Sequence, residues 1–483
     1  MPTSSPLHFL SVLLFICVIS QTTLPLLVNS SKCHPDDESA LLAFKSSLAS
    51  DPSGLLATWQ PNTDCCQWNG ITCLVSNRVT ALTLYGNSSD PRQSLRGSLS
   101  PALGNLSFLG GIYIQNHPFI TGTFPDFLFR LPLLKYVYIE NDNLHGQLPV
   151  NIGRLSILEA LGLAGNHFAG PIPTSVSALT QLTQLNLGRN LLSGTIPVGI
   201  RQLKNLTFLS LEGNRLSGAI PDVFTSFSSL VSLQLSHNQL SGVLPPTISA
   251  LAPRLRYLEL GHNKLGGRIP DYLGKFKSLD TLDLSSNRFS GVVPKSFDNL
   301  TKIFNLDLSR NNLADPFPEM HVKGIESLDL SYNHFSLGKI PSWVTSSPII
   351  YSLKLARCGI KMRLDDWKPS ETYFYDYIDL SENEITGSPI ELMNRTNFLV
   401  GFWADGNQLR FNMSKLPLPK TLKFLGLSRN SVFGKLPDGI SSLETLNVSH
   451  NHLCGRIPAA KFLASAFLGN DCLCGSPLPS CRN

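Results

Sequence analysis

Leucines two positions apart recur along most of this chain, and an asparagine stands three residues after the second leucine of each pair. The segments LNLGRN, LSLEGN, LQLSHN, LELGHN, LDLSSN and LDLSRN show the pattern. Side chains two residues apart point to the same side of an extended strand, so the leucines form a buried face and the residue between them lies on the opposite face. The pattern predicts a short strand at each segment, ending at the asparagine.

The segments recur at a nearly constant spacing. Their last residues, at intervals of 21 to 25, are Asn166, Asn190, Asn214, Asn238, Asn263, Asn287, Asn311, Asn333, Cys358, Asn383, Asn407, Asn430 and Asn451. Upstream, Asp142 and Asn87 hold the same place, with an irregular repeat around IYIQNHPFITG between them, which gives sixteen units. This period and the form L-x-x-L-x-L-x-x-N predict a leucine-rich repeat solenoid, because one unit cannot bury its leucine face alone and stacked units share one core.

The asparagine at the end of each strand has a structural role in this interpretation. Its amide can donate to and accept from backbone groups of adjacent turns that would otherwise be buried without partners. Cys358 takes this ladder position in LKLARC. A reactive thiol needs exposure and a depressed pKa, whereas a buried thiol is a small apolar filler and a weak donor. We predict that Cys358 is an unmodified free thiol, accessible to reagents only after denaturation.

Eight other cysteines lie in two clusters that flank a cysteine-poor middle. The early cluster is Cys33, Cys65, Cys66 and Cys73, and the late cluster is Cys454, Cys472, Cys474 and Cys481. In an oxidising compartment this distribution predicts a disulfide-bonded cap at each end of the repeats.

The N-terminus carries an apolar run from Phe9 to Ile19. The run is too short to span a bilayer and is typical of a secretory signal, although no Lys or Arg precedes it. We expect a secreted protein without a membrane anchor. The expected division is a signal peptide at 1–30 with an approximate cleavage point, an N-terminal cap at 31–76, leucine-rich repeats at 77–453 and a C-terminal cysteine cap at 454–483.

Both ends of the chain resemble a known family. The entry segment HPDDESALLAFKSSLASDPSGLLATWQPNTDCCQWNGITC is similar to the N-terminal cap of plant extracellular leucine-rich repeat proteins, and the tails GPIP, GTIP, GAIP and GRIP match the plant-type repeat. The ending LNVSHNHLCGRIP…CLCGSPLPSC resembles the C-terminal cap of polygalacturonase-inhibiting proteins. The ectodomains of receptor-like proteins and receptor kinases resemble this chain in their caps and repeats.

The resemblance implies a fold and a set of disulfide bonds. The fold is an α/β solenoid, a right-handed curved superhelix of about sixteen plant-type repeats, with a second short sheet beside the first and disulfide-bonded caps. The implied bridges are Cys33–Cys65, Cys66–Cys73, Cys454–Cys472 and Cys474–Cys481, which leaves Cys358 free.

Solenoids of this kind bind through the strand face, and sixteen strands about 4.8 Å apart make a surface roughly 70 Å long. Exposed aromatic residues favour interfaces because they supply rigid contact area. They lie near the N-terminal end (Tyr113, Tyr136 and Tyr138) and near the C-terminal end (Tyr377 and Trp403, with Lys354, Asp379 and Asp405 close by). The segment from Leu337 to Lys415 also breaks the repeat rhythm. The alternative is that these aromatic residues are ordinary surface residues.

An acidic stripe occupies the position between the two leucines. Its members are Glu259, Asp283, Asp307, Asp329 and Asp379. Like charges about 5 Å apart raise each other's pKa and create a negative field that would attract a basic partner. The alternative is a solvated face without a specific ligand. Asp283 and Asp307 also resemble the carboxylate pair of a hydrolase, but a shallow strand face offers no deep pocket, so we do not expect an enzyme.

Other candidate chemistry is weak. Only 15% of residues are charged, and the formal net charge of +5 is spread without a basic run, so we expect no nucleic-acid partner. No phosphate-binding glycine loop or zinc-type cysteine spacing occurs. His450 and His452 flank the ladder residue Asn451 without a third ligand in view. We therefore expect no cofactor, no metal and no catalytic residue.

Several Asn-x-Ser/Thr sequences are candidates for N-glycosylation. The expected sites are Asn105, Asn205, Asn299, Asn394 and Asn412. Asn87 is excluded as a ladder residue, Asn29 belongs to the signal region, and a glycan at Asn447 would block the strand face.

Three functions remain open at this point. The first is a recognition module of the plant cell wall or apoplast, acting in defence or signalling by binding a protein or peptide ligand, such as a receptor kinase ectodomain. The second, implied by the resemblance, is an inhibitor of a pathogen's pectin-degrading polygalacturonase. The third is a structural wall component.

Overall fold

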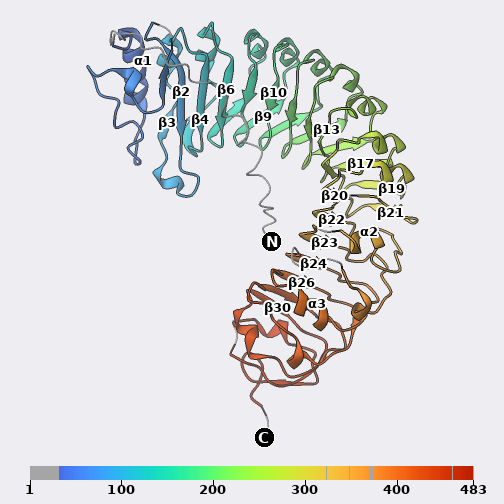
Figure 1. The fold of residues 1–483 in the computed structure, drawn as a ribbon. Coiled ribbons are helices and arrows are strands. Elements are labelled where there is room, and N and C mark those ends of the chain that lie inside the picture. The colour runs from blue at the N-terminus through green and yellow to red at the C-terminus, as the bar shows by residue number, and fades with distance from the viewer. Residues whose placement is uncertain are drawn as a thin grey trace, which may run out of the picture.

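The computed structural model describes residues 32–74, 76–322, 324–347, 349–369, 375–459 and 461–481. The expected signal peptide lies outside these residues. The described chain forms a curved solenoid, with the strands along the inner side of an arc and short helical turns along the outer side (Figure 1). The parallel sheets and the capped ends confirm the solenoid that the repeat predicted.

Helix α1 (Pro35–Ser47) and strand β1 (Ile71–Cys73) form the N-terminal cap. A proline at the first helical position needs no N–H partner, and three acidic residues lie in the first turn, where the helix dipole favours negative charge. Asp37 is buried and accepts hydrogen bonds from the Arg78 guanidinium at 2.8 and 2.9 Å and from Val79 N at 2.8 Å. These bonds tie the helix to the first repeat.

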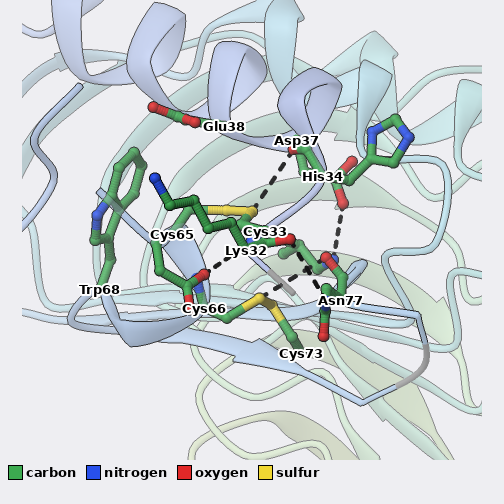
Figure 2. The surroundings of a disulfide bond; sticks show 12 residues. Lys32, Cys33, His34, Asp37, Glu38, Cys65, Cys66, Trp68, Cys73 and Asn77 are labelled. Atoms are coloured by element: carbon green, nitrogen blue, oxygen red, sulfur yellow. Dashed lines mark hydrogen bonds between the residues drawn. A yellow bond between two sulfur atoms is a disulfide. The ribbon is translucent and has the colours of Figure 1, made fainter. Parts of the chain in front are cut away.

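Disulfide bonds close both caps. The early pair, Cys33–Cys65 and Cys66–Cys73, lies next to α1 (Figure 2). The late pair is Cys454–Cys472 and Cys474–Cys481. These are the pairings that the family resemblance implied, and Cys358 is a buried free cysteine.

The main sheet lines the inner side of the arc. Strand β1 pairs with β2 in the antiparallel sense, and the following strands pair in parallel in chain order. The sixteen parallel strands are β2 (Val79–Tyr85), β4 (Gly111–Gln115), β6 (Tyr136–Glu140), β8 (Ala160–Gly162), β10 (Gln184–Asn186), β12 (Phe208–Ser210), β14 (Ser232–Gln234), β16 (Tyr257–Glu259), β18 (Thr281–Asp283), β20 (Asn305–Asp307), β22 (Ser327–Asp329), β23 (Ser352–Lys354), β24 (Tyr377–Asp379), β26 (Gly401–Trp403), β28 (Phe424–Gly426) and β30 (Thr445–Asn447).

A second sheet of ten parallel strands follows the first through the N-terminal two thirds of the chain. Its strands are β3 (Arg96–Ser98), β5 (Phe119–Gly122), β7 (Asn143–Gln147), β9 (His167–Pro171), β11 (Leu191–Gly194), β13 (Arg215–Ala219), β15 (Gln239–Gly242), β17 (Lys264–Arg268), β19 (Arg288–Val292) and β21 (Asn312–Ala314). Beyond β21, the described residues beside the main sheet form two smaller sheets, β25 (Thr386–Gly387) with β27 (Gln408–Leu409), and β29 (Phe433–Gly434) with β31 (His452–Arg456) and β32 (Cys472–Cys474). The second sheet therefore stops just before the segment whose rhythm is irregular.

Short helices connect the two sheets on the outer side of the arc. Most are 3₁₀ helices of three to six residues, such as Pro101–Asn105 and Asp126–Arg130. The irregular segment instead carries the α-helical turns α2 (Ser342–Thr345) and α3 (Ile390–Arg395). No helix among the described residues is long and apolar enough to cross a membrane.

The leucines form one continuous core, and the ladder asparagines satisfy the backbone groups around it. Asn190 Oδ1 accepts a hydrogen bond from Phe168 N at 3.0 Å, and its Nδ2 donates to the carbonyl oxygens of Leu163, Leu187 and Gly188. Leaving these groups unpaired in the interior would cost about 1–3 kcal/mol each. The ladder therefore fixes the position of each strand end and, with it, the side chains on the inner face.

Candidate functional site

The residues between the paired leucines form one column along the inner face. Register pairing aligns Thr83, Tyr113, Tyr138, Gly162, Asn186, Ser210, Gln234, Glu259, Asp283, Asp307, Asp329, Lys354, Asp379, Trp403, Gly426 and Asn447. A second column lies two residues earlier on each strand and includes Tyr136 and Tyr377. The predicted site residues thus share one surface, although they spread over most of its length.

Three aromatic rings pack together near the C-terminal end of this surface, and we call them the aromatic stack. Trp403 lies 6.3 Å from Tyr377 and 5.9 Å from Phe424 between ring centroids, at interplanar angles of 16° and 18°. Tyr377 and Phe424 flank Gly401 in the register of the sheet. A Cβ at Gly401 would collide with the indole ring, so the absence of a side chain there lets Trp403 fill the gap between its two neighbours.

The polar atoms of the stack have no partner in the described part of the chain. Neither the Tyr377 hydroxyl nor Trp403 Nε1 takes part in a hydrogen bond there, and Tyr377 is 37% exposed. Trp403 is half-buried. The other four tryptophans, Trp59, Trp68, Trp343 and Trp367, are buried. The stack therefore offers apolar ring surface together with two free hydrogen-bond donors, as an interface residue would.

Two carboxylates border the stack. Asp405 Oδ1 accepts a hydrogen bond from Ser428 N at 2.8 Å, and Asp379 Oδ1 accepts one from Ser381 N at 3.0 Å. The Asp405 carboxylate and Trp403 both lie over Gly426, where a Cβ would collide with them. Burial, with a smaller contribution from the charge of Asp379, raises the pKa of Asp405. The two acids therefore lie close enough to the rings to act on the same ligand.

The N-terminal aromatic residues, which we call the tyrosine cluster (Tyr113, Tyr136 and Tyr138), are packed differently. Tyr113 and Tyr138 stack with centroids 5.5 Å apart. The Tyr138 hydroxyl donates to Gln184 Oε1 at 2.7 Å, and the Tyr136 hydroxyl donates to Glu159 Oε2 at 2.6 Å. The carboxylate partner raises the pKa of Tyr136 to about 12, and burial raises the pKa of Tyr138 to about 12. Two of the three hydroxyls are thus bound within the protein.

A carboxyl group beside the tyrosine cluster, on the same face of β6, strengthens this internal network. Glu140 Oε1 accepts a hydrogen bond from Asn186 Nδ2 at 3.0 Å, and Oε2 accepts one from Gln115 Nε2 at 2.9 Å. The first bond passes over Gly162, where a side chain would collide with the carboxylate. Burial raises the pKa of Glu140 to about 7. The N-terminal region of the inner face is therefore cross-linked by its own side chains.

The acidic stripe crosses the middle of the face. Asp283, Asp307 and Asp329 each use Oδ1 to accept a hydrogen bond from the serine N–H two residues later, at 2.8–3.0 Å. Burial raises the pKa of all four central members, to about 7 for Glu259 and Asp329 and about 6 for Asp307, and the neighbouring carboxylates contribute. Lys354 Nζ lies 3.8 Å from Asp329 Oδ2 and separates the central members from Asp379.

Neither a metal site nor a deep cleft lies on this face within the described residues. Among the described residues, three potential metal ligands lie close together in the N-terminal cap, namely Cys33, Cys65 and Cys66, and their sulfurs belong to disulfides. His452 Nδ1 lies 3.2 Å from the carboxylate oxygens of Asp471. A cavity of about 500 Å³ lies instead beside the second sheet, where Ser98, Thr121, Phe124, Arg130 and Leu144 contribute to its lining. The inner face is suited to docking rather than to enclosing a small substrate.

Cys358 lies in the ladder, as its place in the repeat predicts. Its side chain is fully buried, with Sγ 3.5 Å from Leu330 O and 3.6 Å from Ala356 O. Burial raises the pKa of this thiol far above its usual range. At neutral pH the group is therefore protonated and inert toward thiolate chemistry.

Comparisons with known proteins agree with this architecture. The leucine rich repeat N-terminal domain matches residues 34–74, and leucine rich repeat models match residues 181–203, 213–313, 324–347 and 442–460. The crystal structure of PEPR1-AtPEP1 superposes with a TM-score of 0.64 at 26% identity, over 92% of this chain and 69% of that one. The crystal structure of a TDR receptor has 30% identity and a TM-score of 0.58, over 80% of this chain and 72% of that one. The chain is a leucine-rich repeat protein of the plant extracellular type.

The curated relatives of this leucine-rich repeat protein include inhibitors and receptors. Polygalacturonase inhibitor 2 of Arabidopsis thaliana is 39% identical over 113 residues, which are 22% of this chain and 34% of the relative. The polygalacturonase inhibitor of Vitis vinifera is 34% identical over 28% of this chain and 38% of its own length. Receptor-like protein EIX2 of Solanum lycopersicum is 30% identical over 30% of this chain and 15% of the relative. The chain thus spans little more than a third of the inhibitors it matches.

The ladder of this leucine-rich repeat protein starts later than the sequence predicted, and the assignment of Asn87 to it was wrong. Asn87 is exposed, and its Oδ1 accepts a hydrogen bond from Ser89 N at 2.9 Å. The buried ladder begins at His117, whose N–H donates to Asp142 Oδ1 at 2.7 Å. The connection after β2 is longer than in later repeats, so Asn87 lies outside the stack of turns. The reason for excluding a glycan at Asn87 therefore no longer holds.

The sequence prediction also missed parts of the site. Phe424, the third ring of the aromatic stack, was not proposed, although it lies in the same column as Tyr377 and could have been found by reading that column on every strand. Gly401 and Gly426 were missed because a glycine carries no chemistry of its own. Their contribution appears only when the ring that lies over them is seen.

Proposed function

We propose that this leucine-rich repeat protein is a secreted recognition module that binds a protein or peptide partner through its inner strand face. The observation that carries the proposal is the aromatic stack, whose rings are partly exposed and whose hydroxyl and indole N–H have no partner in the described chain. Interface hot spots are enriched in tyrosine and tryptophan for these reasons. A long, shallow and continuous surface suits a macromolecule better than a metabolite.

The relatives support the same class of function. They are named as polygalacturonase inhibitors and receptors, and the similar crystal structure is that of PEPR1-AtPEP1. None of these names describes catalysis. Together with a face that lacks an enclosing cleft, they favour a binding protein over an enzyme.

A pull-down from plant cell-wall extracts tests the proposal. The immobilised protein should retain a partner that the double variant Tyr377→Ala/Trp403→Ala does not retain. Tyr85→Ala is a matched control, because this tyrosine is 54% exposed on the same sheet but lies far from the stack. The same partner bound equally by the wild type and the double variant would exclude the stack as the docking site.

Inhibition of a polygalacturonase is the alternative function, favoured by the identity to two inhibitors that are so named. The assay adds purified protein to fungal polygalacturonases and follows the release of reducing ends from pectin. Inhibition of several enzymes would establish this function. If all the enzymes keep full activity at a protein concentration well above their own, the inhibitor function is excluded. The recognition role or a structural role in the cell wall then remains.

Secretion and glycosylation form part of the proposal. Asn105, Asn205, Asn299 and Asn394 are exposed, and Asn412 is half-buried and caps a short helix by accepting a hydrogen bond from Ser414 N. Asn87 joins these candidate sites because it is exposed. Mass spectrometry of protein from plant culture medium, with and without enzymatic deglycosylation, would show which asparagines carry glycans and whether the first 30 residues are removed.

A further inference from the structure

The surroundings of the aromatic stack carry an excess of negative charge. Asp376, Asp379 and Asp405 lie on or beside the strands that bear the rings, and none of them forms an ion pair within the described residues. The nearby lysines are engaged elsewhere. Lys354 lies next to Asp329, and Lys423 Nζ lies 3.0 Å from Glu444 Oε1.

From this arrangement we propose that the aromatic stack, with Asp379 and Asp405, recognises a cationic side chain, arginine or lysine, of a partner polypeptide. The inference rests on the proposed function and adds the chemical class of the partner residue. An arginine side chain fits best, because its planar guanidinium can lie against an aromatic ring while its N–H groups bond to a carboxylate. A lysine would be attracted by the same negative charge, but its ammonium group is not planar and cannot stack on the ring while it bonds to a carboxylate.

Charge complementarity decides against an anionic or purely apolar partner at this place. Each of the two carboxylates uses one oxygen to bind a backbone N–H, which fixes its position on the face. An acidic group docking on the rings would meet these fixed charges, and an apolar group would bury Asp405 further without pairing it, which costs free energy. The acidic stripe on the strands before β24 extends the negative field toward the middle of the face. Two nearby arginines, Arg357 and Arg429, do not lie on the strands of this face but follow them, in the turns.

The first test measures the charge around Trp403 without a ligand. Since the other four tryptophans are buried, dissolved ions should quench mainly the fluorescence of Trp403. At pH 8 and constant ionic strength, each quenching constant is divided by that of free N-acetyltryptophanamide with the same ion. The normalised value should be at least about twofold larger for caesium than for iodide, because the cation concentrates near the carboxylates. Asp379→Asn/Asp405→Asn should remove the difference, and Trp403→Phe should remove most of the quenchable signal. A normalised quenching constant for iodide equal to or larger than that for caesium in the wild type would overturn the proposal.

The second test uses a defined peptide as the probe. Acetyl-Gly-Arg-Gly-Arg-Gly-amide should protect Trp403 from acrylamide quenching, whereas the same peptide with glutamate in place of arginine should not. The Asp379→Asn/Asp405→Asn variant, which keeps the shape of both side chains, should bind the arginine peptide at least about fivefold more weakly, while its melting temperature stays close to that of the wild type. Loss of one contact between the arginine and a carboxylate weakens binding by about 1–2 kcal/mol, which corresponds to such a change in affinity.

The outcomes separate this inference from the proposed function. A partner that is lost with Tyr377→Ala/Trp403→Ala but retained by Asp379→Asn/Asp405→Asn, together with equal effects of the two peptides, would reject the cationic side chain and keep the docking site. Loss of the partner with both double variants and protection by the arginine peptide alone would support both.

Discussion

The tyrosine cluster and the aromatic stack occupy the same face of the same sheet, yet they are built in different ways. In the tyrosine cluster, Tyr136 and Tyr138 donate their hydroxyl protons to side chains of neighbouring repeats. In the aromatic stack, the Tyr377 hydroxyl and Trp403 Nε1 donate to no described residue. Two groups of aromatic residues on one face are therefore connected to the rest of the protein in different ways. The first group cross-links the face, and the second leaves a hydroxyl and an indole N–H without a partner among the described residues.

The two regions also differ in the ladder below the face. The N-terminal region uses His117 and Asp142, and the C-terminal region uses asparagines such as Asn407. Among the described residues, Asp142 Oδ2 and His117 Nε2 have no hydrogen-bond partner, whereas Asn407 uses both the oxygen and the nitrogen of its amide. Burial raises the pKa of Asp142 to about 8, so this carboxyl group is largely protonated at neutral pH.

The largest expected effect comes from making the C-terminal ladder like the N-terminal one. Asn407→Asp replaces an amide that donates to the carbonyl oxygens of Leu380, Ala404 and Asp405. A buried carboxylate cannot donate and loses its hydration, so the variant should be about 2–4 kcal/mol less stable at pH 8. Urea unfolding followed by circular dichroism measures the change. A midpoint equal to that of the wild type at pH 8 would show that the ladder tolerates charge.

The reverse change sharpens the same comparison. The pKa of Asp142 is about 8 in the folded chain and about 3.9 when unfolded, so the folded state binds more protons in between and stability falls as pH rises from about 4 to 8. Asp142→Asn removes this titration and should stabilise the protein by about 1–3 kcal/mol at pH 8 and little at pH 4. Thermal melts at the two pH values check the prediction, and an equal gain at both would contradict it.

A hydroxyl deletion in each aromatic group should have unequal effects. Tyr138→Phe removes the hydrogen bond to Gln184 and should cost about 1 kcal/mol. Tyr377→Phe removes a hydroxyl without a described partner and should change the unfolding free energy by less than about 0.3 kcal/mol. The pair is matched in chemistry, and both residues lie on the inner face, Tyr138 in the column between the leucines and Tyr377 in the column two residues earlier. Equal losses in urea unfolding would mean that the two regions are not built differently.

The acidic stripe lies between the two regions and should add a smaller dependence on pH. Its raised pKa values, about 6 for Asp307 and about 7 for Asp329, lie above the unfolded value, so stability falls as pH rises through about 4 to 7. Asp307→Asn/Asp329→Asn keeps the acceptor for the serine N–H and should flatten this decline by about 1 kcal/mol, because both groups still touch solvent. The slope of melting temperature against pH is the measurement.

The smallest expected effect is at Cys358. Alkylation of the native protein should be undetectable over hours, and one thiol should react after unfolding in guanidinium, because the side chain is fully buried and its pKa is raised. Mass spectrometry after each treatment counts the modified thiols. Rapid native modification would place the sulfur at the surface.

The fold was predictable because the sequence motif that produces it repeats at a nearly constant spacing. Leucines two apart with an asparagine at a fixed distance determine strand, core and ladder in one motif, as the pairing of Leu185 with Leu209 and the bonds of Asn190 show. Asn87 was assigned wrongly because it fits the local motif, whereas the connection after β2 is longer than in later repeats and places this residue outside the stack of turns. The column of residues on the inner face was equally predictable, since strand register follows from stacking.

The character of the site could not be predicted in the same way. Whether a tyrosine is free or bound depends on side chains one or two repeats away, such as Gln184, which lies 46 residues from Tyr138. The position of Trp403 depends on two glycines on its own and the next strand. These relations arise from packing across repeats, and no local sequence pattern reports them.

One binding experiment can compare the two aromatic groups directly. A partner captured from wall extract is titrated against the wild type, Tyr377→Ala/Trp403→Ala and Tyr113→Ala/Tyr138→Ala, and the melting temperature of each protein is recorded. The first double variant should lose binding at least about 100-fold with little change in melting temperature, while the second should melt several degrees lower and bind nearly as well. Binding lost through the tyrosine cluster and kept without the aromatic stack would contradict this expectation.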